Sequence, residues 1–136
     1  MRYVLDTSVV LQIFAGIRPL DMTGFDELQI SSLTYGELFE GVALAKTDIE
    51  RERRHIALNI IRSHFPHPIP YGLHEASFQS VIATEASSLS RANKVDRMIV
   101  ATARAHGCVL LTLNGKDLKG IDGVLDLNDR FADTES

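Results

Sequence analysis

The sequence predicts an α/β fold, a three-layer α/β/α sandwich built on a small, mostly parallel sheet. Two observations lead to this prediction. Short apolar runs that are typical of buried strands, Tyr3–Leu5 and Val109–Thr112, lie far apart, and the segments between them place apolar residues at helical spacing. Strands joined through helices pair in parallel, and the helices then cover both faces of the sheet. The 136 residues suit one domain, which we expect to span residues 1–131, with a loose tail over 132–136.

The first elements are a strand, a helix and a second strand. Tyr3–Leu5 is the first strand, and the apolar spacing after it predicts a helix over Ser8–Phe14. Thr7 or Ser8 is expected to cap this helix, because a hydroxyl oxygen accepts hydrogen bonds from the first free backbone N–H groups. Leu28–Ser31 is expected to form the second strand.

Helices are predicted through the middle of the chain. Thr34 is expected to cap a helix that runs to Lys46, and Glu37 stands three residues later, at the spacing of a capping box. Further helices are predicted over Asp48–Phe65 and Leu73–Arg91. The apolar face of the former contains Ile49, Ile56 and Ile60, and the inward candidates of the latter are Ala76, Val81, Ala83 and Leu89.

The last third of the chain returns to the sheet. Asp96 is expected to begin an apolar helix, and Gly107 ends it at a position where glycine is preferred. Val109–Thr112 is the third strand, a turn through Asn114 and Gly115 follows, and Val124–Leu127 is expected to be a short final strand.

Composition narrows the classes of function. The net charge is −4, and there is no Trp, so binding of nucleic acid through bulk positive charge or a large stacking surface is not favoured. The single cysteine, Cys108, excludes an internal disulfide and a cysteine-based zinc site. Neither a signal segment nor an apolar run of about 20 residues is found, so a cytoplasmic protein is expected.

Four acidic residues follow or begin the predicted elements: Asp6, Glu37, Asp96 and Asp117. Asp6 ends the first strand and Asp117 lies just beyond the third, and the carboxyl ends of parallel strands meet at one edge of a sheet. Each acid also has a structural explanation. Glu37 suits a capping box, Asp96 a helix N-terminus and Asp117 a turn, whereas Asp6 at the end of a buried strand requires a partner.

A cluster of carboxylates predicts a divalent cation. Without a counter-ion the charges repel, so one or more groups would hold a proton. Hard oxygen ligands suit Mg²⁺ or Mn²⁺, and such ions activate water for phosphodiester hydrolysis. Loops typical of nucleotide binding, a G-x-S-x-G motif and an H-E-x-x-H motif are absent from the sequence, so a covalent hydrolase is poorly supported.

Together, the four motifs resemble the PIN-domain family, and within it the small VapC-type ribonucleases of bacterial toxin–antitoxin pairs. The resemblance rests on four segments in order: Val4–Ser8, Ser31–Leu38 followed by Gly41, Asp96–Ala103 followed by Gly107, and Leu110–Leu118. The family often has an aromatic residue after the last acid, where this chain has Leu118.

The resemblance implies an α/β PIN-like fold and a metal-dependent endoribonuclease that cleaves RNA with metal-activated water. Asp6, Glu37, Asp96 and Asp117 would be both the catalytic residues and the ligands of Mg²⁺ or Mn²⁺. The supporting polar groups would be Thr7, Ser8, Thr112 and Asn114. It also implies an antitoxin protein that occupies the active-site cleft, and a homodimer. The apolar residues proposed for such a surface are Leu11, Phe14, Leu38, Phe39 and Val42.

Basic residues in the helix predicted over Asp48–Phe65 are candidates for RNA contacts: Arg51, Arg54 and Arg62. The alternative is a solvated helix face on which arginines pair with Asp48, Glu50 and Glu52. Two other functions stay open: a non-catalytic metal- or partner-binding domain of the same fold, and a signalling receiver that is phosphorylated on Asp6.

Overall fold

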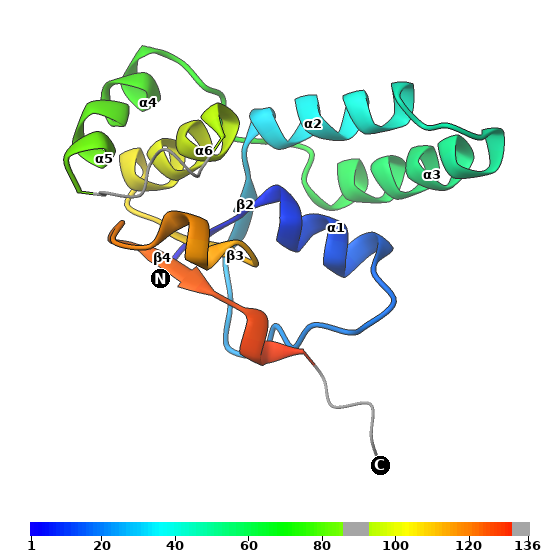
Figure 1. Ribbon diagram of the computed structural model, residues 1–136, viewed down its shortest axis with the longest axis horizontal. Coiled ribbons are helices and arrows are strands. Elements are labelled where there is room, and N and C mark those ends of the chain that lie inside the picture. Colours follow the sequence, from blue (N-terminus) through cyan, green and yellow to red (C-terminus); the bar gives the residue numbers. More distant parts are fainter. Residues whose placement is uncertain (86–92, 132–136) are drawn as a thin grey trace.

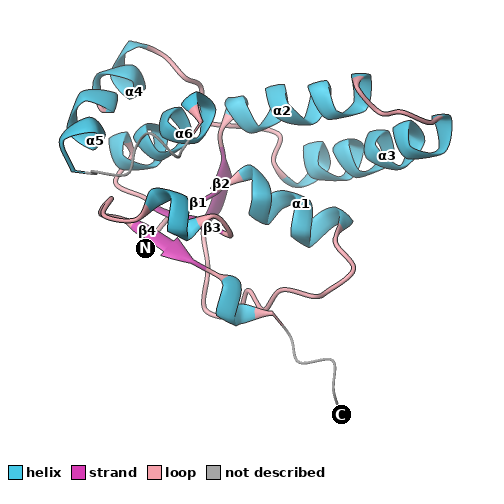
Figure 2. Cartoon of the chain, in the orientation of Figure 1, coloured by secondary structure: helices cyan, strands magenta, loops and turns pink. Residues whose placement is uncertain are grey.

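The computed structural model describes residues 1–85 and 93–131 and shows an α/β fold. A parallel sheet has the strand order β2-β1-β3-β4. The strands are β1 (Tyr3–Leu5), β2 (Leu28–Ile30), β3 (Val109–Thr112) and β4 (Val124–Asp126). The helices are α1 (Thr7–Ala15), α2 (Ser32–Ala43), α3 (Asp48–His64), α4 (Leu73–Ser77), α5 (Gln79–Glu85) and α6 (Lys94–Ala105), with 3₁₀ turns η2 (Gly115–Leu118) and η3 (Asn128–Arg130). The predicted fold class is confirmed (Figures 1 and 2).

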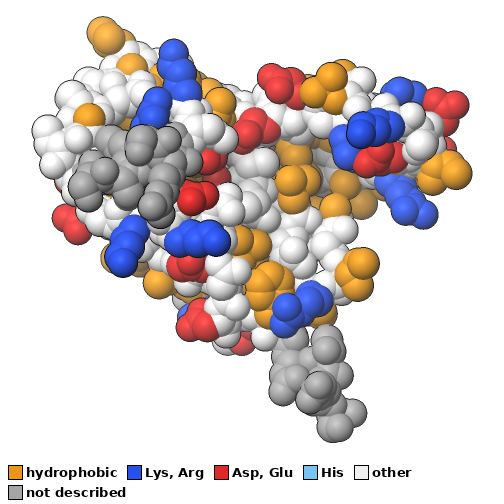
Figure 3. All heavy atoms as spheres, in the orientation of Figure 1, with side chains coloured by type: hydrophobic (Ala, Val, Ile, Leu, Met, Phe, Trp, Pro, Cys, Tyr) orange, Lys and Arg blue, Asp and Glu red, His pale blue; other side chains and the backbone are white. Residues whose placement is uncertain are grey.

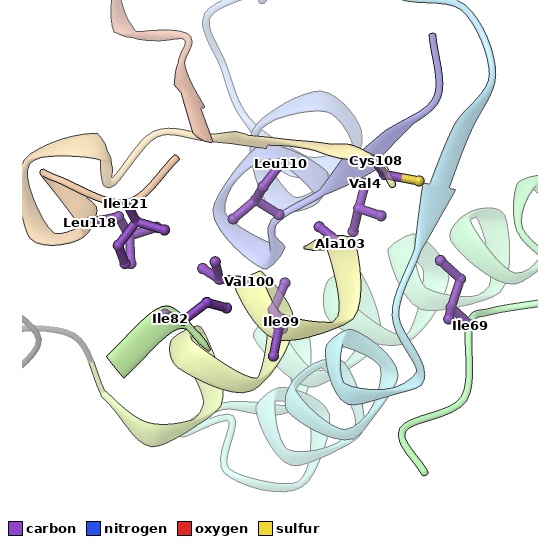
Figure 4. Close-up of a cluster of buried hydrophobic side chains, with 11 residues drawn as sticks. Val4, Ile69, Ile82, Ile99, Val100, Ala103, Cys108, Leu110, Leu118 and Ile121 are labelled. Atoms are coloured by element: carbon purple, nitrogen blue, oxygen red, sulfur yellow. The ribbon is translucent and has the colours of Figure 1, made fainter. Parts of the chain in front are cut away.

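Helices cover both faces of the sheet. Because successive side chains of a strand point to opposite faces, Val4 packs with the residues of α6, whereas Leu5 packs with Val9 and Val10 of α1. Figure 1 shows α4, α5 and α6 on one side and α1 and α3 on the other. Figure 4 shows Ile99, Val100 and Ala103 of α6 turned toward the strands. The two apolar clusters therefore lie between the sheet and the helices on either side of it, as the two interfaces of a three-layer sandwich.

The α2–α3 hairpin extends from the edge of the sheet (Figure 1). Buried Leu58 and Ile61 of α3 pack in the same cluster as Leu38 of α2. The Tyr35 hydroxyl of α2 donates to the carbonyl of Phe65 at 2.6 Å, which fixes the end of α3. The hairpin thus holds the first turns of α2 in place beside the sheet.

The predicted apolar face of α3 is not the buried one. Ile49, Ile56 and Ile60 are 68%, 52% and 44% exposed, while Leu58 and Ile61 are buried. Both sets are spaced as on one face of a helix, so apolar periodicity alone could not distinguish the core-facing set.

The single helix predicted over Leu73–Arg91 is also wrong. The chain forms α4 and α5, which are separated at Phe78, and Leu89 and Arg91 lie outside the described residues. Among the predicted inward residues, Val81 and Ala83 are exposed and Ala76 is half-buried; Glu75 and Ile82 are buried instead.

Residues 124–131 return along the edge of the sheet and contact the loop after α1. Leu20 and Phe131 form an antiparallel bridge, and the guanidinium of Arg130 lies over the ring of Phe25. Within the described ranges, no helix has both the length and the apolar character needed to cross a membrane.

Candidate active site

Asp6 lies at the carboxyl end of β1 and caps α1. Its side chain is only 3% exposed, and Oδ1 accepts a hydrogen bond from the backbone N–H of Thr7 at 2.9 Å. Oδ2 accepts from the hydroxyls of Thr112 at 2.7 Å and Ser8 at 3.0 Å. The predicted cap at Thr7 or Ser8 is therefore wrong. The acid itself is the cap, and its buried charge is stabilised by three donors.

The groups that hold Asp6 are themselves held by the chain after β3. Ser8 Oγ accepts from the backbone N–H of Leu113 at 3.2 Å, and Thr112 Oγ1 accepts from that of Asn114 at 2.9 Å. Each hydroxyl thus has an acceptor and a donor partner, so its hydrogen is directed at Asp6. Asn114 contributes its backbone N–H here, and its side chain is exposed to solvent.

Glu37 does not belong to a capping box. α2 begins at Ser32, and the Ser31 side chain caps it by accepting from the N–H of Leu33 at 3.0 Å. Thr34 is consequently in the first turn, and Glu37 is one turn further along. Its Oε1 accepts instead from the Thr7 hydroxyl of α1 at 2.6 Å. The interpretation of Glu37 as part of a capping box is therefore wrong. Its side chain is directed to the Asp6 end of β1.

Asp96 and Asp117 complete the set from two further elements. Asn93 caps α6 by accepting from the N–H of Asp96 at 2.7 Å, so Asp96 lies in the first turn and is half-buried. Asp117 lies in η2, just beyond β3. The first turns of α1, α2 and α6 meet at the centre of Figure 1. Partial positive charge at helix N-termini favours acids in this position.

The charges of the four acids act on one another. Burial, followed by the carboxylates of Asp6, Glu37 and Asp117, raises the pKa of Asp96 from 3.8 to about 6. Figure 3 shows acidic side chains gathered over the centre of the molecule, between the helices on either side. The charges of Asp6, Glu37 and Asp117 thus act on Asp96, as expected if the four acids lie near one another at this edge of the sheet.

The donor chemistry at this edge fits a hard divalent cation. No three carboxylate, imidazole or thiol groups in residues 1–85 and 93–131 are close enough to form a metal site as they stand. Repulsion separates carboxylates when no cation lies between them, and a cation reverses this effect. Glu37 Oε2 and the side-chain oxygens of Asp96 and Asp117 accept no hydrogen bond within these ranges. These oxygens would be the ligands, with Asp6.

Comparison with known proteins identifies the family. A sequence profile described as "PIN domain" matches residues 3–124. The chain belongs to the PIN domain family. It is 28% identical over 126 residues to "Ribonuclease VapC1" of Rickettsia felis, which covers 91% of this chain and 93% of that protein. It is 27% identical over 123 residues to "Ribonuclease VapC" of Rickettsia bellii, with coverages of 89% and 91%.

Solved structures share the architecture of this PIN domain. A VapBC-5 toxin–antitoxin structure from Mycobacterium tuberculosis has a TM-score of 0.73 at 24% identity and covers 93% of this chain and 97% of its own. FitAcB from Neisseria gonorrhoeae has a TM-score of 0.73 at 23% identity, with coverages of 91% and 96%. The resemblance that the four sequence motifs predicted is confirmed, and the similarity to these structures shows the fold.

A groove opens beside the acids of this PIN domain. Its volume is about 450 Å³, and Thr7 and Glu37 line one part of it. Apolar residues of α1, α2 and α3 line most of the remainder: Leu11, Ala15, Leu38, Ala57, Leu58 and Ile61. Arg54 also lines this groove, where its guanidinium donates to the Gly41 carbonyl and pairs with Glu50.

The three candidate arginines of the PIN domain occupy different places. Arg54 lines the groove beside Glu37, and Arg62 lines a second groove of about 640 Å³ between α2 and α3. Arg51 pairs with Asp48 at 2.7 Å. Arg51 and Arg54 pair with acids of α3, as expected if they belong to a solvated helix face rather than to an RNA-binding surface. Among the described residues, Arg62 is the candidate without such a pair.

Thr34 is the site residue that sequence reasoning missed. Its side chain is fully buried, and its hydroxyl lies 3.0 Å from that of Thr7. The spacing Thr34-x-x-Glu37 was visible, but it indicated a helix cap. The distinguishing signal was Ser31, an equally good cap three residues earlier.

Proposed function

We propose that this protein is a divalent-metal-dependent endoribonuclease and the toxin of a toxin–antitoxin pair. The observation that carries the proposal is the electrostatic coupling of Asp96 to Asp6, Glu37 and Asp117 at the carboxyl edge of a PIN-domain sheet. Relatives named ribonuclease VapC support the reaction, and VapBC toxin–antitoxin structures of the same fold support the setting.

The four acids would hold Mg²⁺ or Mn²⁺. When bound, the cation supplies Lewis acidity for water and offsets the charge of the phosphodiester. Asp6 is held rigidly by Thr7, Ser8 and Thr112. Asp96 and Asp117 have side-chain oxygens available to ligands, and a bound cation would offset the repulsion that raises the pKa of Asp96 in the metal-free protein. RNA as the substrate would place the protein in the cytoplasm.

The apolar groove beside Glu37 would receive the antitoxin. Leu11, Leu38 and Leu58 offer an apolar surface that suits one face of an amphipathic helix. A basic side chain from such a helix would pair with Glu37 or Asp96 and so exclude a cation. This arrangement explains how one small partner could block both the groove and the acids.

Cleavage of total cellular RNA by the purified protein tests the proposal. We expect fragments in Mg²⁺ or Mn²⁺, intact RNA with EDTA, and a loss of at least 100-fold in rate for Asp6→Asn, because a metal ligand and its charge are lost. Asp26→Asn is the matched control, because Asp26 is an exposed acid before β2, at the opposite end of the sheet from Asp6. This variant should cleave RNA like the wild type.

Equal cleavage by wild type and Asp6→Asn would contradict the site. Binding of Mn²⁺ without any RNA cleavage, by protein shown to be free of a bound partner, would favour the non-catalytic alternative. The receiver alternative has lost its support, because the family match is to PIN domains.

A further inference from the structure

Thr34 departs from the usual behaviour of a hydroxyl on a helix. Elsewhere in the described chain, Thr84 donates to the carbonyl of Val81 at 2.7 Å and Thr102 to that of Met98 at 2.8 Å. Such bonds to the carbonyl three or four residues earlier are common for helical Thr and Ser. The fully buried Thr34 hydroxyl instead faces Thr7 of α1, and this contact therefore needs its own explanation.

Thr34 lies in the first turn of α2, where the carbonyl four residues earlier is not part of the helix. That carbonyl belongs to Ile30 of β2 and accepts from the N–H of Ile69 at 2.9 Å. The Ser31 carbonyl, three residues earlier, accepts from the N–H of Thr34 itself at 3.0 Å. The Thr34 hydroxyl instead lies 3.0 Å from that of Thr7 in α1.

The direction of the hydrogen bond between the two threonines follows from counting hydrogens. A hydroxyl has one hydrogen, and an ionised carboxylate only accepts. The Thr7 hydroxyl donates its single hydrogen to Glu37 Oε1 at 2.6 Å. The hydrogen between Thr7 and Thr34, at an oxygen–oxygen distance of 3.0 Å, must therefore come from Thr34. The result is a directed chain from Thr34 through Thr7 to Glu37.

We propose that Thr34 is a positioning residue for Glu37. By donating to Thr7, Thr34 occupies the acceptor side of that hydroxyl, so the Thr7 hydrogen is directed at Glu37 Oε1 and Oε2 would be available to a cation. This inference rests on the proposed metal site and adds a residue that contacts neither cation nor RNA. Supporting groups behind metal ligands typically contribute about 10–100-fold to metal affinity.

Titration of metal-free protein with Mn²⁺ by calorimetry tests this role. We expect Thr34→Val to weaken Mn²⁺ binding about tenfold, because its shape is kept and the hydroxyl is lost. Thr34→Ser should restore binding to within about twofold. Thr102→Val is the matched control, since Thr102 is equally buried on a helix but bonds within it, and it should bind like the wild type.

The same measurement in a Glu37→Ala background separates positioning from general damage. If Thr34 acts through Glu37, adding Thr34→Val to Glu37→Ala should change the affinity less than about twofold. An equal loss in both backgrounds, or no loss in the wild-type background, overturns the proposal. If Thr34→Val fails to fold by circular dichroism, Thr34→Ala takes its place under the same criteria.

A crystal structure of metal-free Thr34→Val provides a readout that does not depend on binding. We expect the Glu37 carboxylate to leave Thr7, and an unchanged contact between them would overturn the proposal. Wild-type protein that binds no Mn²⁺ would instead refute the proposed metal site, and with it any role of Thr34 in holding a ligand. Failure of RNA cleavage alone would leave the positioning role intact.

Discussion

Asp96 is the residue whose charge depends most on its neighbours. Its pKa is raised to about 6 by burial first and then by the carboxylates of Asp6 and Glu37. A raised pKa means that the folded protein binds this proton more tightly than the unfolded chain does. The contribution of Asp96 to stability therefore falls as pH rises from about 4 through about 6, and it is lost above that range.

Replacing Asp96 with Asn should stabilise the metal-free protein at pH 7.5. The expected gain in the free energy of unfolding is about 1 kcal/mol, after the pKa shift is discounted for partial exposure of the side chain. Urea unfolding in EDTA at pH 7.5 measures this gain, which should disappear near pH 4. Added Mn²⁺ should stabilise the wild type more than the variant, and a variant that is less stable in EDTA would contradict this account.

Asp6 and Asp117 could be predicted as neighbours because a parallel sheet collects strand ends at one edge. Glu37 and Asp96 were proposed with them, although each also had an explanation as a helix-end residue. Thr34 was predicted only as a helix cap, because its contact with Thr7 depends on where α2 begins, and apolar spacing does not define a helix end closely. The earlier start of α2 removes the capping explanation for Glu37 and places Thr34 beside Thr7.

At the scale of elements, the buried acid Glu75 of α4 forms a hydrogen bond with His106 at the end of α6. Glu75 accepts from the N–H of Gly72 and from His106, each at 2.8 Å. These two bonds, in that order, hold the pKa of Glu75 below its usual value. The stabilisation is present above pH 4.5 and is lost as pH falls through the lowered pKa.

We expect Glu75→Gln to lower the free energy of unfolding by about 1–2 kcal/mol at pH 7, because buried partners lose a charged acceptor. Urea unfolding at pH 7 and at about pH 3 checks this, and the difference from the wild type should shrink at the lower pH. Glu52→Gln on the exposed face of α3 is the matched control. A pH-independent difference would show that shape, rather than charge, matters at this position.

The arginines of α3 provide a second test at this scale. If Arg54 and Arg62 contact RNA phosphates, replacing both with Ala should reduce the slope of log affinity against log salt by about 1.4, or 0.7 for each contact. The measurement uses a short single-stranded RNA in an Asp6→Asn background, which prevents cleavage. Arg53→Ala, on another face of α3, is the control and should leave the slope unchanged. If the double variant also leaves the slope unchanged, Arg54 and Arg62 do not contact RNA phosphates and belong to the solvated face of α3.

Elements near the sheet were easier to predict than those away from it. β1 and β3 have the predicted bounds, because β1 is a short apolar run that ends before Asp6 and β3 is one that ends on Thr112, shortly before Asn114 and Gly115. The break between α4 and α5 has no glycine or proline signal at Phe78, and it was missed. α3 has apolar residues on two faces, and only the position of α1 and α2 decides which face is buried.

At the scale of the whole molecule, the residues predicted for a dimer or antitoxin surface do not form one exposed surface. Leu38 is buried, whereas Leu11 and Phe39 are 45% and 53% exposed. Leu11 lines the groove beside the acids, and Phe39 lines the second groove between α2 and α3. Different surfaces are thus available for a partner protein and for a second copy.

We therefore expect Phe39→Glu to disrupt a homodimer and Leu11→Glu to preserve it. Light scattering at micromolar concentration measures the mass, which is 15.1 kDa for one chain. A wild type that is monomeric at this concentration would refute the dimer. Loss of the dimer in Leu11→Glu alone would instead place the second copy in the groove that we assign to the antitoxin.

The central position of β1 has a consequence for synthesis of the protein in the cell. Thr112, which donates a hydrogen bond to Asp6, lies 106 residues later in the chain. β1 also needs β3 on one side before the sheet is continuous. A nascent chain therefore carries an incomplete site until β3 has been synthesised, and if the protein is the ribonuclease that we propose, products that terminate before β3 should be unable to cleave RNA.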